Sequence, residues 1–193
     1  YPGPDTDEII QKSLQHDDAL IRHTALRAMS QLDQETTLQL IAPKLYDPVK
    51  AVRIEAAARL AAIEEKDIRE ADRQAFSTGL KEYRTAMEYN SDFAPQRYNL
   101  GNLEQTLGNS EKAKKYYLEA IDIDDQFYPA KVNLAMVLTT EGDNKEAENL
   151  LRDVDESEPE LHETAYSLCL LLAEMENFEV AAMYLGWAAD GLP

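Results

Sequence analysis

Residues 108–120 read GNSEKAKKYYLEA, residues 142–154 read GDNKEAENLLRDV, and residues 176–188 read ENFEVAAMYLGWA. The three stretches are evenly spaced with a period of 34, and each opens on a polar turn at Gly108, Gly142 or Glu176. A fixed period of about 20–50 residues is typical of repeat architectures, in which one small structural unit is stacked on copies of itself. This period therefore decides the fold of the second half of the chain.

Around each turn, small and large residues recur in the same phase. Large residues stand at Leu100, Leu134 and Leu168 and at Tyr117, Leu151 and Leu185. Small or medium residues stand at Gly101, Ala135 and Cys169, at Ala113, Ala147 and Ala181, and at Ala120, Val154 and Ala188. Small residues let two helices approach closely, and a large residue fills the space beside them. The pattern predicts two antiparallel helices in each unit.

This pattern resembles the tetratricopeptide repeat family, in which each repeat of about 34 residues forms two antiparallel helices. The resemblance covers full units at 94–127, 128–161 and 162–193, and a half unit at 67–93 that shares Gly79, Tyr83, Ala86 and Ser91. Two family positions depart from the pattern. Asp125 replaces the closing proline of the first unit, and Glu104, Leu138 and Leu172 replace the aromatic residue of the first helix.

Residues 1–66 follow a different spacing. His16-Asp-Asp-Ala-Leu-Ile-Arg22 is echoed by Asp47-Pro-Val-Lys-Ala-Val-Arg53, at a spacing of 31, and an Ala-rich segment follows each. This pattern is similar to HEAT repeats over residues 5–65. The resemblance implies that Asp47 caps a helix, that Pro48 lies in its first turn, and that each arginine reaches back to an acidic group of a neighbouring unit.

We therefore predict an all-α fold, a right-handed α-solenoid of antiparallel helix hairpins with a concave face along its length. HEAT-like repeats would form residues 1–66, and tetratricopeptide repeats residues 67–193. No strands are expected. Eleven helices are predicted near 5–15, 18–31, 34–45, 48–64, 67–90, 94–107, 110–123, 127–141, 144–156, 160–175 and 178–190.

The formal charge of −18 limits the classes of partner. Residues 1–90 hold 12 Lys and Arg against 16 Asp and Glu, whereas residues 91–193 hold 7 against 21. Such a field repels nucleic acid and anionic membranes and favours neutral or basic partners. No apolar run reaches the roughly 20 residues that span a bilayer. Because the chain starts at Tyr1, we expect a fragment or processed product. The lack of a spanning run predicts a soluble protein, and the sequence leaves periplasm and cytoplasm as alternative compartments.

No catalytic constellation is present, so we predict a protein that is not an enzyme and needs no cofactor or metal. The three histidines are scattered, and no phosphate loop, nucleophile elbow or zinc motif occurs. Asp122, Asp124 and Asp125 lack the spacing of a calcium loop. Cys169 occupies the packing position of Gly101 and Ala135, which predicts a buried, inert thiol.

The binding site that the resemblance implies is the concave face formed by the first helix of each hairpin. Asn99 and Asn133 stand where family members often grip a peptide backbone, and an amide both donates and accepts. Equally, these two asparagines could only join neighbouring helices. The inner positions where that clamp needs Lys or Arg hold Tyr98, Pro129 and Asn133, which sets aside capture of a C-terminal carboxylate. The predicted peptide-binding residues are Tyr98, Asn99, Asn102, Gln105, Val132, Asn133, Met136 and Tyr166, with Thr106, Thr139, Thr140, Ser167, Leu170 and Glu174 beside them.

Two functions follow from these observations. The leading hypothesis is a non-catalytic protein–protein interaction scaffold that binds a peptide segment in the concave groove. The alternative is a structural or docking appendage of a larger exported protein, because the joined arrays resemble the C-terminal region of some bacterial multihaem cytochrome-related proteins. Tyr184 and Trp187 on the last helix are expected to be exposed, which would permit a homodimer through that helix.

Overall fold

A computed structural model describes residues 4–29 and 33–190, and over these residues the chain is helical and contains no strand. The chain divides into two compact units, Tyr1–Tyr89 and Asn90–Pro193, and each is described by itself. The prediction of an all-α fold is confirmed for the described part. The predicted change of repeat type at 66/67 and the right-handed sense of the solenoid stay predictions.

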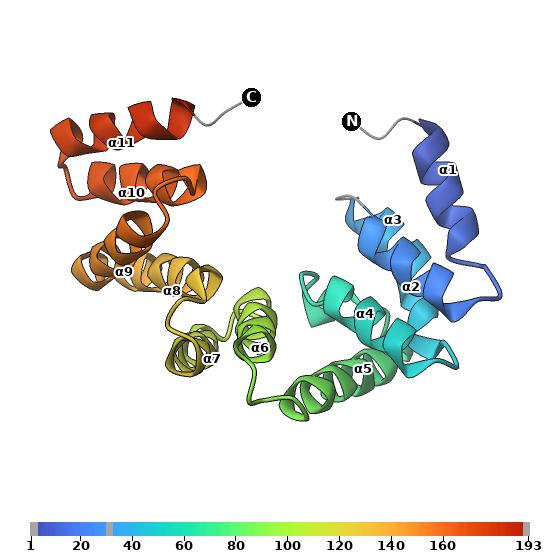
Figure 1. The fold of residues 1–193 in the computed structure, drawn as a ribbon. Coiled ribbons are helices and arrows are strands. Elements are labelled where there is room, and N and C mark those ends of the chain that lie inside the picture. Colours follow the sequence, from blue (N-terminus) through green and yellow to red (C-terminus); the bar gives the residue numbers. More distant parts are fainter. Residues whose placement is uncertain (1–3, 30–32, 191–193) are drawn as a thin grey trace. The chain divides into compact units, whose positions relative to one another are not determined.

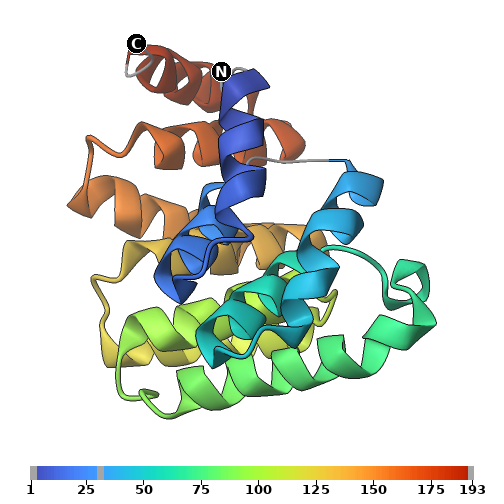
Figure 2. The same cartoon turned by 90° about the vertical axis from the view of Figure 1, so that its right-hand side faces the viewer.

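The first unit combines five α-helices with two short 3₁₀ helices. In order they are α1 (Pro4–Ser13), α2 (Ala19–Ala28), α3 (Gln34–Ile41), η1 (Ala42–Tyr46), α4 (Lys50–Leu60), η2 (Glu65–Asp67) and α5 (Glu70–Glu88). Helix α4 packs against α2 on one side and against α5 on the other, and α5 forms one long continuous helix (Figure 2). A Cβ atom on Gly79 of α5 would lie 2.6 Å from Ala57 Cβ of α4, so only glycine permits this approach.

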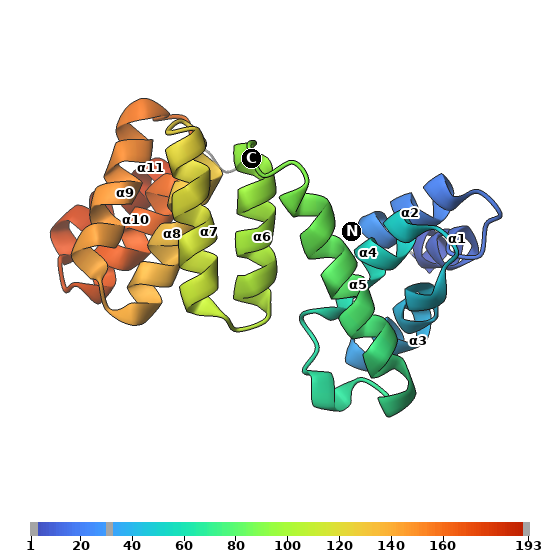
Figure 3. The same cartoon turned by 90° about the horizontal axis from the view of Figure 1, so that it is seen from below.

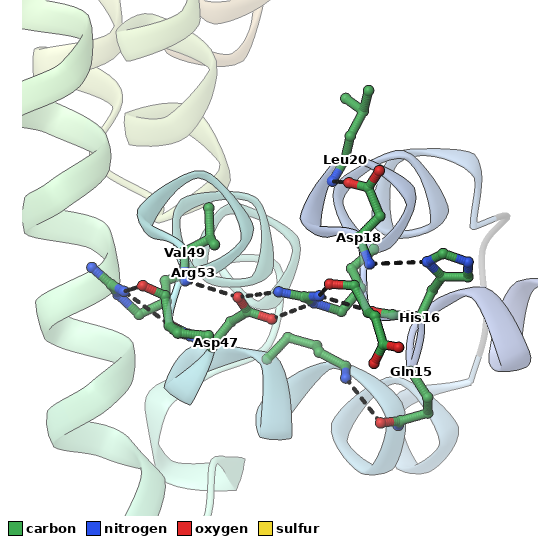
Figure 4. Close-up of polar contacts among 11 residues, drawn as sticks. Gln15, His16, Asp18, Leu20, Asp47, Val49 and Arg53 are labelled. Carbon is green, nitrogen blue, oxygen red and sulfur yellow. Dashed lines mark hydrogen bonds and ion pairs between the residues drawn. The ribbon is translucent and has the colours of Figure 1, made fainter.

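Two arginines hold the turns of the first unit in the same way (Figure 4). Arg22 donates to the carbonyls of His16 and Asp17, each at 2.8 Å, and forms two bonds of 2.7 and 2.8 Å to the Asp47 carboxylate. Arg53 repeats this arrangement with the carbonyls of Asp47 and Pro48 and with the carboxylate of Glu82. Planar guanidinium groups suit such paired contacts.

These contacts correct two expectations. Both arginines reach forward to an acidic residue later in the chain, rather than back. In addition, α4 begins at Lys50, so Pro48 precedes the helix, and Asp47 accepts the Val49 N–H at 2.9 Å within the turn. The reason is that both oxygens of the Asp47 carboxylate bond Arg22 of α2. The carboxylate therefore joins α2 to the turn before α4 and does not cap the first turn of α4.

The Asp47 carboxylate is almost fully buried. Burial by itself would raise its pKa, but the hydrogen bonds from Arg22 and the Val49 N–H outweigh burial, and the pKa is lowered below its ordinary value. The charged form is therefore the one that the folded unit stabilises.

Over its described residues, the second unit consists of six helices in three hairpins, and Figures 1 and 3 show their arrangement. The helices are α6 (Ala94–Thr106), α7 (Ser110–Ile123), α8 (Tyr128–Glu141), α9 (Asn144–Ser157), α10 (His162–Glu174) and α11 (Phe178–Asp190). Each helix packs against the next one in the chain. Their bounds agree closely with the predicted ones.

The turn inside each hairpin has the same backbone geometry. Gly108, Gly142 and Glu176 have φ values of 76°, 87° and 61°, in the left-handed region. The N–H of the following residue then bonds the carbonyl five positions back, as in Asn109 to Glu104 (2.8 Å) and Asp143 to Leu138 (2.9 Å). This is the arrangement by which helices commonly end, and glycine adopts it without strain. The turns predicted from the repeat period are confirmed.

The predicted small and large positions meet inside the first two hairpins, whereas in the third the predicted large residue Leu185 is 52% exposed and Tyr184 is buried instead. Tyr117 of α7 is fully buried, and its ring lies against Gly101 of α6, where an added Cβ would stand 2.4 Å from Tyr117 Cε1. Glu104, in the aromatic position of the family, is also buried, and it accepts a 2.8 Å hydrogen bond from Asn109 Nδ2. In the described ranges, no helix has both the length and the apolar character needed to cross a membrane.

We predict that Asp47→Asn lowers the melting temperature of the first unit at neutral pH, because the Arg22 guanidinium loses its counter-charge. Since the pKa of Asp47 is lowered on folding, its stabilisation is present above the ordinary value of 3.8 and is lost as the pH falls below it. The difference between Asp47→Asn and wild type should therefore shrink in acid. Circular dichroism melts from neutral to acid pH measure this, and a difference that is constant with pH would contradict it.

Two glycines form a matched pair for a test of helix packing. Gly101→Ala should destabilise the second unit by about 1–3 kcal/mol, because the Tyr117 ring must move. Gly186 of α11 has open space at its Cβ position, so Gly186→Ala should stabilise by about 0.5–1 kcal/mol through helix propensity. Urea unfolding followed by circular dichroism compares the two, and equal effects would show that the Gly101 contact is unimportant.

Candidate functional site

The predicted binding residues lie on α6, α8 and α10, the first helices of the three hairpins. They recur at spacings of three and four, which places them on one face of each helix. We call this set the first-helix face. Its members are Tyr98, Asn99, Asn102, Gln105, Thr106, Val132, Asn133, Met136, Thr139, Thr140, Tyr166, Ser167, Leu170 and Glu174.

At its α6 end, this face is a polar network. Asn133 Nδ2 donates to Asn102 Oδ1 at 2.8 Å and to the Tyr98 hydroxyl at 3.3 Å, which joins α8 to α6. The Tyr117 hydroxyl lies 2.8 Å from Asn102 Oδ1 and 2.5 Å from Gln105 Oε1, and these two amide oxygens share its one hydrogen. The structure thus brings together four of the predicted residues around a buried tyrosine.

The sequence pattern indicates only that Tyr117 is a large packing residue. Its equivalents are Leu151 and Leu185, so its hydroxyl has no counterpart in the other two hairpins. A buried tyrosine usually finds a hydrogen-bond partner, and this rule could have indicated the network. Burial raises the pKa of Tyr117 to about 12, and the hydroxyl therefore keeps its hydrogen at neutral pH.

The network bears on whether Asn133 binds a peptide or only joins neighbouring helices. The Asn133 amide donates hydrogen bonds to α6, as expected if it joins neighbouring helices. Asn99 is half-buried on the same face of α6. Contact of either asparagine with a peptide stays a prediction.

Further along the face, the side chains become apolar and exposed. Met136 is 53% exposed, Tyr166 51% and Leu170 50%, whereas Val132 is half-buried against the core. By the repeat period, Ser167 and Met136 are the equivalents of Asn133 and Asn102, which touch each other. By analogy, we expect Met136 of α8 to lie beside Ser167 of α10.

Charge on the first-helix face has one sign. None of its members is Lys or Arg, and Glu174 is the charged one. Glu163, one turn before Tyr166 on α10, is also exposed. The basic residues of α6 and α8 are held elsewhere, since Arg97 pairs with Glu119 and Lys131 with Asp153.

Other predicted residues have clear positions. Cys169 is buried in the core of the second unit, as expected. The expectation that Tyr184 is exposed is wrong, because its ring packs inward and its hydroxyl bonds Asp155 at 3.3 Å. Trp187 is half exposed and meets the Tyr184 ring edge-on, with 4.9 Å between the two ring centroids. His16 Nδ1 accepts the Asp18 N–H at 3.0 Å in a turn.

Comparison with known proteins supports the tetratricopeptide part of the repeat assignment and not the HEAT-like part. Residues 97–127 match the tetratricopeptide repeat family model. No curated protein sequence matches the chain. The crystal structure of MamA is similar over 99% of this chain and 95% of that one, with 14% identity and a TM-score of 0.58. A structure of PilF from Pseudomonas aeruginosa is similar over 97% of this chain and 78% of that one, with 19% identity and a TM-score of 0.59. At these identities, the likeness shows the fold alone, and it is consistent with an α-solenoid.

We predict that Tyr117→Phe destabilises the second unit by about 1 kcal/mol, because the amide oxygens of Asn102 and Gln105 lose their shared donor. Tyr166→Phe is the matched control, since this tyrosine is half exposed on the same face, and it should change stability little. Chemical unfolding of both variants provides the measurement. Equal stability of the Tyr117→Phe variant and wild type would show that the network does not hold α6 against α7.

Proposed function

We propose that the protein is a non-catalytic interaction scaffold that binds a peptide segment of a partner protein on the first-helix face of its second unit. The observation that carries this proposal is the row of Met136, Tyr166 and Leu170, each about half exposed on neighbouring first helices. Exposed apolar residues that cluster on one face are typical of protein-binding surfaces, and methionine and tyrosine adapt to varied partners.

The two ends of the face would have different roles. The network at α6 uses its polar atoms within the chain, which fixes the shape of that end before a partner arrives. The apolar residues of α8 and α10 would supply the contact area. Because Glu163 and Glu174 are the charged groups beside them, a neutral or basic segment would be favoured over an acidic one.

Three further hypotheses stay open beside this proposal. The first is the HEAT-like class of residues 1–66, which rests on the sequence spacing of 31 between His16–Arg22 and Asp47–Arg53. The second is the homodimer through α11, for which Trp187 remains as an exposed side chain. The third is the appendage of a larger exported protein, for which motifs in neighbouring coding sequence would be the test.

The test is a selection of random displayed peptides on the whole protein. We expect enriched peptides to contain apolar residues with Lys or Arg and to lose at least about tenfold in affinity on Met136→Ser plus Leu170→Ser, because burial of each apolar side chain contributes on the order of 1 kcal/mol.

Leu118→Ser provides the matched control, since Leu118 is 44% exposed but lies on α7, a second helix. Affinity should be unchanged in this variant. If peptides bound the double variant and wild type equally well, the first-helix face would not be the binding site.

A further inference from the structure

The first two hairpins each contain a cation held between their two helices. In the first hairpin, Arg97 Nη1 of α6 lies 2.8 Å from Glu119 Oε2 of α7. In the second, Lys131 of α8 bonds Asp153 of α9, at the equivalent positions of the next repeat. In both cases the carboxylate follows the basic residue at the same interval along the chain, so the pair is a repeated feature of the hairpin.

The surroundings of Lys131 show which groups hold a buried cation at this position. Its side chain is only 10% exposed, and its ammonium lies 5.7 Å from the centre of the Tyr128 ring as well as against the Asp153 carboxylate. An aromatic face and a carboxylate together compensate an ammonium group for its lost water.

The third hairpin has lost both members of the pair. Ala165 stands at the position of Arg97 and Lys131, and Trp187 stands at the position of Glu119 and Asp153. His162 takes the position of Tyr128. A cavity of about 420 Å³ opens to solvent there, between α9, α10 and α11, and it is lined by Asp155, Pro159, His162, Ala165 and Trp187.

The chemistry of the earlier site is retained in this cavity, although its groups come from other positions. The carboxylate is now Asp155 of α9, and the aromatic surface is the half-exposed indole of Trp187. His162 Nδ1 lies 3.2 Å from the Trp187 carbonyl, which connects the start of α10 with α11. Arg152, one turn before Asp155 on α9, is bonded to Glu148 through Nε and Nη2 at 3.0 and 2.7 Å.

We propose that this cavity binds a cationic side chain, Lys or Arg, of a partner protein, which takes the place of the basic residue that the third hairpin lacks. The cavity shares no residue with the first-helix face, so this site is independent of the proposed function. The excess of acidic over basic residues in 91–193 would attract such a partner.

Trp187 is the only tryptophan of the chain, so its fluorescence reports on this cavity directly. The probes are the peptide N-acetyl-Gly-Lys-Gly-amide and its analogue with norleucine, which has nearly the same shape but no charge. We expect the lysine peptide to change Trp187 emission in a saturable manner, with at least about fivefold higher affinity than the norleucine peptide. Equal effects of the two peptides would overturn the proposal.

Three variants of the whole protein complete the test. Ala165→Lys supplies the missing ammonium from within and should abolish the response to the lysine peptide. Asp155→Asn, which keeps the size of the side chain, should weaken binding at least about fivefold. Glu156→Gln removes a neighbouring exposed carboxylate that does not line the cavity, and it should leave affinity nearly unchanged.

Because Ala165 is buried, circular dichroism must show that the Ala165→Lys variant is folded, and Asp155→Asn decides the question if it is not. Unchanged binding in Asp155→Asn would overturn the proposal. An equal loss in Asp155→Asn and Glu156→Gln would also overturn it, because it would indicate general attraction to an acidic chain.

Discussion

The contact between Gly101 and the Tyr117 ring sets the distance between α6 and α7, and much of the second unit depends on it. The ring can lie against α6 at this distance only because position 101 has no side chain. That position in turn brings the tyrosine hydroxyl to Asn102 and Gln105, and Asn102 also receives Asn133 from the next hairpin. One close approach therefore fixes a hairpin and its junction with the following one.

The same framework is used differently in each hairpin. At the position of Asn102, the later hairpins have Met136 and Leu170, so the face changes from an internal polar network to exposed apolar side chains. At the position of Arg97 and Lys131, the third hairpin has Ala165, and a cavity replaces an ion pair. Most positions that hold the helices together stay small or large as the period requires, except that Tyr184 is buried in place of Leu185. Positions beside them differ in chemistry, and these differences create the candidate sites.

In the first unit, charged side chains join successive helices. Arg22 and Arg53 each hold two carbonyls of their own turn and a carboxylate further along the chain. Each guanidinium thereby satisfies backbone groups that a turn would otherwise leave unpaired. The direction of these contacts, forward along the chain, depends on which faces of α2, α4 and α5 meet.

The sequence by itself determined the helices and turns of the second unit and the packing role of Cys169, because the repeat period and the spacing of small residues are local properties of the chain. In the first unit, the predicted helices 34–45 and 48–64 are shorter, and 3₁₀ helices follow them. The sequence also indicated which residues share the first-helix face, since helical spacing fixes this. Only the tertiary structure decided that Asn133 bonds Asn102, that Tyr184 turns inward while Trp187 stays half exposed, and that a cavity opens beside Ala165. These outcomes depend on how side chains from different helices meet, and a period along one chain does not contain that information.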